Sequence, residues 1–104
     1  MIYRQGDVLI ERITKTPRKT QPVKRDAGRI VLAYGEVTGH AHAIASRAAE
    51  LTETELGERF LRVLAEGGVA LRHEEHATIQ IPQGDYRIRQ QREYSPEAIR
   101  NVAD

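Results

Sequence analysis

The sequence contains no cysteine and no tryptophan, and aromatic residues make up only 5% of its 104 residues. Without cysteine, no disulfide framework can stabilise the fold, and a bound metal would need histidine, aspartate or glutamate ligands. With so few aromatic residues, the core must rest mainly on Ile, Leu, Val and Ala. The length corresponds to one domain, which can bury a core but has little surplus stability. We therefore expect a single domain over residues 1–104.

The sequence also lacks a strong charge of one sign and any long apolar run. Its 16 basic and 15 acidic residues leave a net charge of only +1. A dedicated nucleic-acid-binding domain is usually strongly basic, so this balance disfavours nucleic acid as a partner, except through a local basic patch. The first residues lack the apolar segment of a signal peptide, and no run could span a bilayer. Together with the absence of cysteine, these features favour a cytoplasmic protein without membrane contact.

Short β-branched segments separated by glycine and proline predict an all-β fold, a small sandwich or barrel. The expected strands cover residues 7–14, 29–34, 69–73, 77–82 and 85–94. The second of these is apolar throughout and should be buried on both faces. An extended segment should also begin near Gly39. After the last strand, Ser95 as N-cap and Pro96 at the first helical position predict a short C-terminal helix to about Val102.

Residues 46–68 allow two interpretations. Apolar residues recur at helical spacing at Leu56, Phe60 and Leu64. Residues 58–64 also alternate as a strand, and a turn at 65–68 would then join them to 69–73 as a hairpin. We favour the hairpin because both flanks have β character.

A basic loop is expected at residues 15–28, where two prolines and few apolar residues indicate a mobile connection. Its basic residues, opposed only by Asp26, are Lys15, Arg18, Lys19, Lys24 and Arg25. The loop is either simply solvated or a contact surface for an acidic partner or a phosphate backbone. In the second case the protein would be a non-enzymatic interaction module. The loop would then bind a partner protein, nucleic acid or the acidic 50–58 segment of a neighbouring subunit. Exposed strand edges are compatible with a homodimer.

All four histidines lie in two tight pairs, at positions 40 and 42 and at positions 73 and 76. Alternate residues of a strand point to the same face, so His40 and His42 can aim at one point. His73 and His76 can converge only where the chain bends, and the two glutamates between them disfavour a regular buried strand. This segment could therefore close over the first pair.

The four histidines would then supply three or four nitrogen ligands. Glu74 or Glu75 would bind the ion, orient a ring or act as a general base. Three nitrogens with an open position are typical of catalytic zinc, and an added carboxylate suits Fe²⁺, Mn²⁺ or Ni²⁺. If the site is catalytic, the ion would activate water or a substrate oxygen and a glutamate would move the proton.

The sequence thus predicts a small protein that binds a divalent transition metal (Zn, Fe, Mn or Ni). Two alternatives stay open: the same residues could form a polar pocket without metal, or the histidines could lie on the surface without a shared role. The substrate, a small molecule or a protein, is not indicated.

The last expected strand carries further candidates for ligand binding. Arg87 and Arg89 could bind an anionic ligand near the histidines, because guanidinium forks suit carboxylate or phosphate. Tyr94, at the end of the same strand, could line the site or its rim. The alternative is an exposed strand face whose arginines pair with acidic neighbours.

The pair His40 and His42, followed by the Pro-Gln-Gly turn at 82–84, resembles the pattern of a minimal cupin over about residues 36–94. The resemblance implies a small β-barrel with a metal held by His40 and His42. The chain departs from the pattern because no glutamate soon follows the first pair and Arg87 stands where a histidine follows the turn. Only His40 and His42 are therefore carried over as ligands.

Two further resemblances concern other stretches. The segments GEVTGHAHAI, HEEHA and QREYSPEAIR are similar to a group of small uncharacterised bacterial and phage proteins, which implies a family but no activity. DVLIER at 7–12 and RIVL at 29–32, with the polar loop between them, resemble the first strand, mobile loop and second strand of the chaperonin cofactor family.

Overall fold

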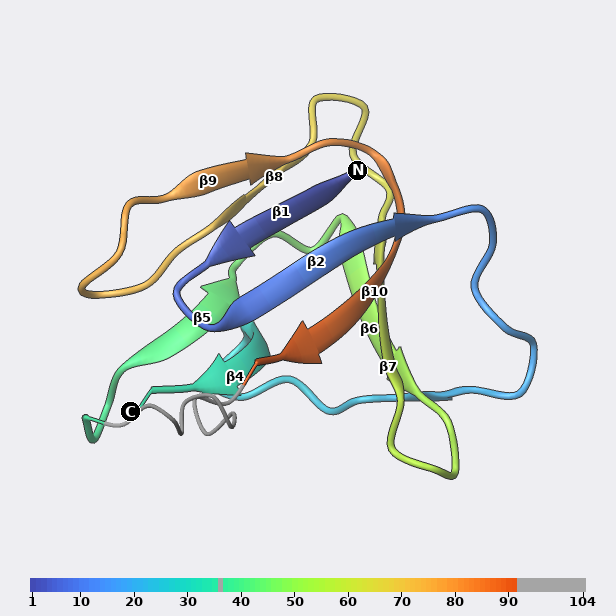
Figure 1. The fold of residues 1–104 in the computed structure, drawn as a ribbon, viewed down its shortest axis with the longest axis horizontal. Helices are drawn as coiled ribbons and strands as arrows, with labels where there is room; N and C mark the ends of the chain where they lie inside the picture. Colours follow the sequence, from blue (N-terminus) through green and yellow to red (C-terminus); the bar gives the residue numbers. More distant parts are fainter. Residues whose placement is uncertain (36, 92–104) are drawn as a thin grey trace, which may run out of the picture.

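The computed structural model describes residues 1–35 and 37–91, which form antiparallel strands and contain no helix (Figure 1). The strands are β1 (Ile2–Gln5), β2 (Val8–Ile13), β3 (Gln21–Pro22), β4 (Ile30–Tyr34), β5 (Ala41–Ile44), β6 (Ala49–Glu53), β7 (Arg59–Val63), β8 (Val69–Leu71), β9 (Ile79–Ile81) and β10 (Gly84–Gln90). The all-β prediction is confirmed. The expected C-terminal helix and Tyr94 lie outside the described residues.

One layer is a six-stranded sheet in the order β1-β2-β10-β7-β6-β3 (Figure 1). Its strands alternate between a buried and a wetter face, as the period of two requires. In β2, Val8 and Ile10 are fully buried, and in β10 Tyr86 and Ile88 are buried. Ile10 lies opposite Ile88 in the register, so the apolar sides of the two strands coincide on the core face.

The second layer consists of the β4–β5 and β8–β9 pairs. Ala43 and Arg72 exchange two backbone hydrogen bonds of 2.9 Å, which join β5 to the end of β8. The core lies between the two layers. Its side chains that are at most 1% exposed include Leu32, Ile44, Leu61, Leu71 and Ile81. Burial of such a side chain stabilises the fold by about 1.5–3 kcal/mol.

Residues 46–68 contain two strands and no helix. β6 and β7 pair with each other around a turn closed by the Thr54 N–H, which donates to Glu58 O at 2.8 Å. The expected strand at 58–64 is therefore present as β7, but the expected hairpin with 69–73 is wrong. β7 pairs with β6 and β10, whereas β8 pairs with β9. The turn at 65–68 instead carries the chain from one layer to the other, because both strands bury their apolar sides in the core.

The basic loop is held to the acidic strand of the same chain. Its short strand β3 pairs with β6, and the Val23 N–H donates to Leu51 O at 2.8 Å. The Arg25 guanidinium donates to the carbonyls of Ser46 and Ala49. At the start of the loop, Thr16 donates twice to Asp85. The loop is thus attached at several points along its length.

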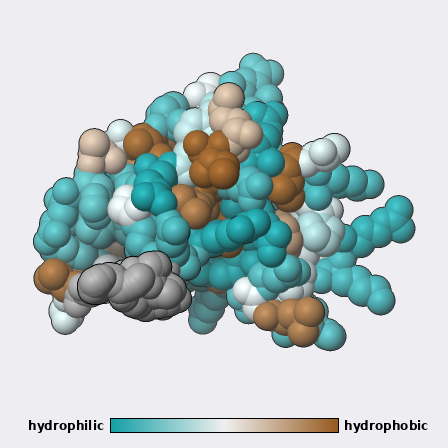
Figure 2. All heavy atoms as spheres, in the orientation of Figure 1, coloured by the Kyte–Doolittle hydropathy of each residue, from teal (hydrophilic) through white to brown (hydrophobic). Residues whose placement is uncertain are grey.

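In the described ranges, residues 1–35 and 37–91, the large hydrophobic side chains that remain exposed are Met1, Ile2, Tyr34, Val37, Leu56 and Leu64. Figure 2 shows a face covered mainly by hydrophilic residues, with the hydrophobic ones in separate patches. Scattered exposed apolar residues are usual on a protein surface and do not by themselves mark an interface. Across the part of the chain that the structure describes, no helix has the length and apolarity needed to cross a membrane.

Candidate functional site

The first histidine pair lies at the start of β5. His42 is only 3% exposed, although it is polar, and it lies on the core side of the strand with Ile44. His40, one residue before the strand, is partly exposed. The carbonyl of His40 accepts a hydrogen bond from the Gly35 N–H at 2.8 Å, which fixes the end of the β4–β5 hairpin.

The second pair meets the first because the chain turns after β8. The His73 ring lies at the centre of the group, with its centroid 4.2 Å from that of His42, 4.6 Å from His76 and 5.7 Å from His40. The structure therefore brings all four histidines together, as the spacing of the pairs predicts. Their role as metal ligands stays a prediction.

Two glycines allow the rings to pack this closely. At Gly6, in the β1–β2 turn, a Cβ atom would lie 2.8 Å from Nε2 of His76, and φ is +60°. At Gly35, a Cβ would lie 3.0 Å from Cβ of His40 and 3.2 Å from Nε2 of His73. A side chain at either position would force a neighbouring histidine to shift, so both glycines belong to the site.

A buried glutamine fixes the tautomer of His42. Gln5 is 3% exposed, and its amide Nε2 donates to the carbonyls of Leu71 and Ala77, each at 2.9 Å. Its Oε1 must therefore be the atom that faces His42 Nδ1 at 2.8 Å, and it can only accept. The proton of the neutral His42 ring consequently sits on Nδ1, and Nε2 keeps its lone pair.

The lone pair of His42 faces the carboxylate of Asp7. Nε2 lies 3.7 Å from Asp7 Oδ1, while Oδ2 accepts a hydrogen bond from Gln90 at 3.0 Å. Burial lowers the pKa of His42, and the neighbouring His73 lowers it further, against the opposing effect of Asp7. His42 is thus a neutral base at pH 7 whose free nitrogen points to a carboxylate.

The two glutamates between the second pair make different contacts. The Ala41 N–H donates to Glu74 Oε1 at 2.9 Å, and this bond, with a second from the residue's own N–H, lowers the pKa of Glu74. Glu75 lies 3.3 Å from His40 Nδ1, and its N–H donates to His73 Nδ1 at 3.0 Å. Since His73 Nδ1 accepts this bond, the neutral His73 ring carries its proton on Nε2.

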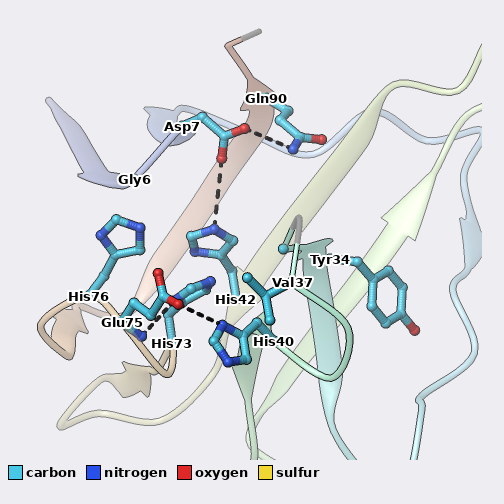
Figure 3. A pocket seen from close by; sticks show the side chains of 11 residues that line it. Gly6, Asp7, Tyr34, Val37, His40, His42, His73, Glu75, His76 and Gln90 are labelled. Carbon is cyan, nitrogen blue, oxygen red and sulfur yellow. Dashed lines mark hydrogen bonds and ion pairs between the residues drawn. The ribbon is translucent and has the colours of Figure 1, made fainter. Parts of the chain in front are cut away.

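The histidines open onto a cavity of about 610 Å³. It is lined by Gly6, Asp7, Tyr34, Gly35, Val37, His40, His42, His73, Glu75, His76 and Gln90. Figure 3 shows the rings gathered on one side, Asp7 and Gln90 opposite them, and Tyr34 apart. The wall is therefore polar at the histidines, while Tyr34 and Val37 make its apolar part.

One set of side chains in this region meets the spacing needed for an ion. Ligand atoms of His40, His73 and Glu74 all lie within 4.8 Å of one another. In a tetrahedral site with bonds of about 2.1 Å, neighbouring ligand atoms are about 3.4 Å apart. Small rotations of these side chains, which are partly or fully exposed, would close that difference. His42 and His76 lie beside the set and are not members of it.

Arg87 and Arg89 are not brought to the histidines. Arg87 pairs with Glu58 and Arg89 with Glu11, each at 3.1 Å. Neither lines the cavity. The structure agrees with the alternative interpretation of this strand, in which the arginines of an exposed face pair with acidic neighbours.

Sequence reasoning missed the parts of the site that come from the β1–β2 turn and from the end of β10. They are Gln5, Gly6, Asp7 and Gln90, together with Gly35. Gly6 followed by Asp7 is a turn signal, but nothing in its local pattern relates the turn to the histidines of the two distant pairs. Nothing in the sequence indicates that Gln5 is buried, since it is polar and the other residues of β1 are exposed or partly exposed.

A family model described as a domain of unknown function, DUF8820, matches residues 4–91. The chain belongs to this family. No curated protein and no solved structure matches the chain. The matched range of the DUF8820 domain includes every residue that lines the cavity, so the site is part of the domain that defines the family.

Proposed function

We propose that this DUF8820 domain binds a divalent transition metal ion through His40, His73 and Glu74, with His42 as a neutral base beside the ion. The proposal rests on one observation, the mutual distance of at most 4.8 Å between ligand atoms of these three side chains. They come from two segments more than 30 residues apart, so the tertiary fold assembles them. Two imidazoles and one carboxylate, without thiolate, suit Zn²⁺, Fe²⁺, Mn²⁺ or Ni²⁺.

The ionisation state of Glu74 and the contact made by His40 support this role. Hydrogen bonds that lower the pKa of Glu74 keep its carboxylate negative at neutral pH. The contact between Glu75 and His40 Nδ1 would leave His40 Nε2 free to bind an ion, with Glu75 orienting the ring. A carboxylate must be ionised to bind a metal, and Glu74 meets this condition at pH 7.

Metal binding would change one hydrogen bond at the rim. His73 Nδ1 accepts the Glu75 N–H. Coordination through Nδ1 would replace that bond, and coordination through Nε2 would move the ring proton to Nδ1, where it faces the same N–H. In either case the Glu75 N–H loses its partner. The hydrogen bonding of the Glu75 amide should therefore change when the ion binds.

Three protein ligands would leave coordination positions open, and two of the ligands, His40 and His73, line the cavity of about 610 Å³. Open positions are typical of catalytic rather than structural metal sites. When bound, the ion would supply Lewis acidity. His42 would accept a proton at its free Nε2, and Asp7, 3.7 Å away, would stabilise the imidazolium that forms.

The test is metal content and affinity in matched histidine variants. Untagged protein purified without chelator is analysed for Zn, Fe, Mn and Ni, then titrated with each ion. We expect about one ion per chain, lost in His40→Ala and in His73→Ala. His76→Ala is the control, because its ring lines the same cavity but stands outside the ligand set. Circular dichroism verifies that each variant is folded.

Two results would contradict the proposal. One is wild-type protein that binds no ion even after reconstitution. The other is a folded His76→Ala variant that loses the ion as completely as His73→Ala. A second measurement is hydrogen exchange at the Glu75 amide, which should become faster when the ion is added.

A further inference from the structure

A second cavity, of about 260 Å³, lies on the other side of β5 from the histidine cavity. It is lined by Arg29, Ala41, Ala43, Ala45, Arg72, His73 and Glu74. The alternation of β5 produces the two sides: His42 and Ile44 point one way, and the alanines point the other. The two cavities share His73.

The strand register places one arginine at each edge of an alanine floor. Ile30 lies opposite Ile44, and both point into the core, so the preceding Arg29 points to the outer face. Across β5, Ala43 forms a bridge with Arg72, and opposite residues of an antiparallel pair share a face. Ala43 is itself only 4% exposed. The result is a small apolar floor of alanines with one arginine residue on each side of it.

These arginines differ from those of the six-stranded sheet. Arg59, Arg62, Arg87 and Arg89 each lie within 4.0 Å of a carboxylate. Within residues 1–35 and 37–91, neither Arg29 nor Arg72 has such an ion pair or a side-chain hydrogen bond. Among the described residues, two arginines that have no carboxylate within 4.0 Å thus line one small cavity, and planar guanidinium forks suit carboxylate and phosphate oxygens.

We infer that Arg29 and Arg72 bind the anionic group, carboxylate or phosphate, of a small ligand whose other end reaches the proposed metal site. His73 lines both cavities, and Glu74 lines the second cavity while belonging to the proposed ligand set. A ligand held by its anionic end therefore lies next to the ion. The reach to the metal rests on the proposed function, whereas anion binding itself does not.

Glu74 makes the two binding events dependent on each other. Its carboxylate faces the same cavity as the arginines and repels an anion. A metal ion on Glu74 would neutralise that charge, so phosphate should bind more tightly to the metal-loaded protein. By linkage, phosphate should tighten metal binding by the same factor.

The test is a titration of the full chain with inorganic phosphate and, separately, with acetate, followed by NMR chemical shifts of the alanine amides of β5. It is run on metal-free and on metal-loaded protein. The variant is Arg29→Gln/Arg72→Gln, and the control is Arg18→Gln/Lys19→Gln, which removes the same charge from the basic loop. We expect Arg29→Gln/Arg72→Gln to weaken anion binding by about tenfold or more, because charge-assisted hydrogen bonds are lost. The control variant should bind the anions as the wild type does.

Each outcome decides a point. Binding of phosphate alone or acetate alone supports the site and identifies the ligand's anionic group, and binding of both supports the shared chemistry. No binding of either anion, with or without metal, overturns the inference, as does equal weakening in the control. Arginine-dependent anion binding in a protein that takes up no metal would uphold the anion site and refute the proposed metal centre. Metal uptake without arginine-dependent binding would do the reverse.

Discussion

The hydrogen bonds of Gln5 make it the most informative single position outside the histidines. Gln5→Leu keeps the approximate size of the side chain and removes its polar atoms. The change deletes two bonds to the carbonyls of Leu71 and Ala77 and one bond from His42 Nδ1. It leaves the buried His42 Nδ1–H without its Gln5 partner and takes one hydrogen bond from the buried carbonyl of Leu71.

The expected loss of stability follows from these three bonds. An intramolecular hydrogen bond contributes about 1 kcal/mol net, and an orphaned buried group costs about 1–3 kcal/mol. The apolar leucine side chain offsets part of this, so we expect a decrease of about 3 kcal/mol in the free energy of unfolding. For a domain of this size that corresponds to a fall in Tm of roughly 12–24 °C.

The assay is urea and thermal unfolding followed by circular dichroism, with Gln80→Leu as the matched control. Gln80 makes one exposed hydrogen bond, to Gly67 O, and its substitution should change stability by at most about 0.5 kcal/mol. Nitrogen NMR of the wild type should also find the His42 proton on Nδ1. Equal stability of the two variants, or a proton on Nε2, would refute the reasoning about Gln5.

Three further predictions concern other contacts of the fold. Gly6→Ala should displace His76 and destabilise the protein by about 1 kcal/mol or more, because the residue has φ of +60° and a Cβ would lie 2.8 Å from the ring. Urea unfolding measures the loss of stability. NMR chemical-shift changes confined to position 6 would contradict the displacement of His76. Since burial lowers the pKa of His42 below its usual 6.5, the unfolded chain binds the proton more readily, so stability should fall as the pH drops below about 6.5; His42→Gln should flatten that part of the profile. Burial raises the pKa of Asp85, but hydrogen bonds from Thr16 and Arg62 outweigh this effect and lower the pKa below its usual 3.8. Thr16→Val should therefore cost about 1 kcal/mol at pH 7 and less near pH 3, with no pH dependence as the contrary result.

The strands that local pattern predicts are those with clean alternation or a continuous apolar run. Residues 30–34 and 84–90 are of this kind, and both are strands. β6 gave only a weak signal, because it is short and contains just two buried apolar residues, Ala49 and Leu51. Pairing was harder still, since β7 finds one partner, β10, more than 20 residues away. Loop length and turn residues do not encode that contact.

The candidate site, like the fold, could be predicted from the sequence only in part. The approach of the two histidine pairs follows from their spacing, because one pair shares a strand face and the other brackets a bend. The environment of His42 does not follow, because Gln5 and Asp7 reach it only when the β1–β2 turn packs against β5 in the tertiary fold. The tautomer and the lowered pKa of His42 depend on those contacts and on burial. A sequence can therefore indicate which rings gather, but not which nitrogen of each ring is free.

The alternation of β5 has a consequence for how the family can change. His40 and His42 line the histidine cavity, whereas Ala41, Ala43 and Ala45 line the cavity of the arginines. A slip of one residue in the pairing would exchange the two sets, turning the imidazoles out and the alanines in. The reciprocal hydrogen bonds between Ala43 and Arg72 hold the strand in its register. An insertion or deletion within this strand would thus remove both cavities' chemistry at once, whereas a substitution can alter one and leave the other intact.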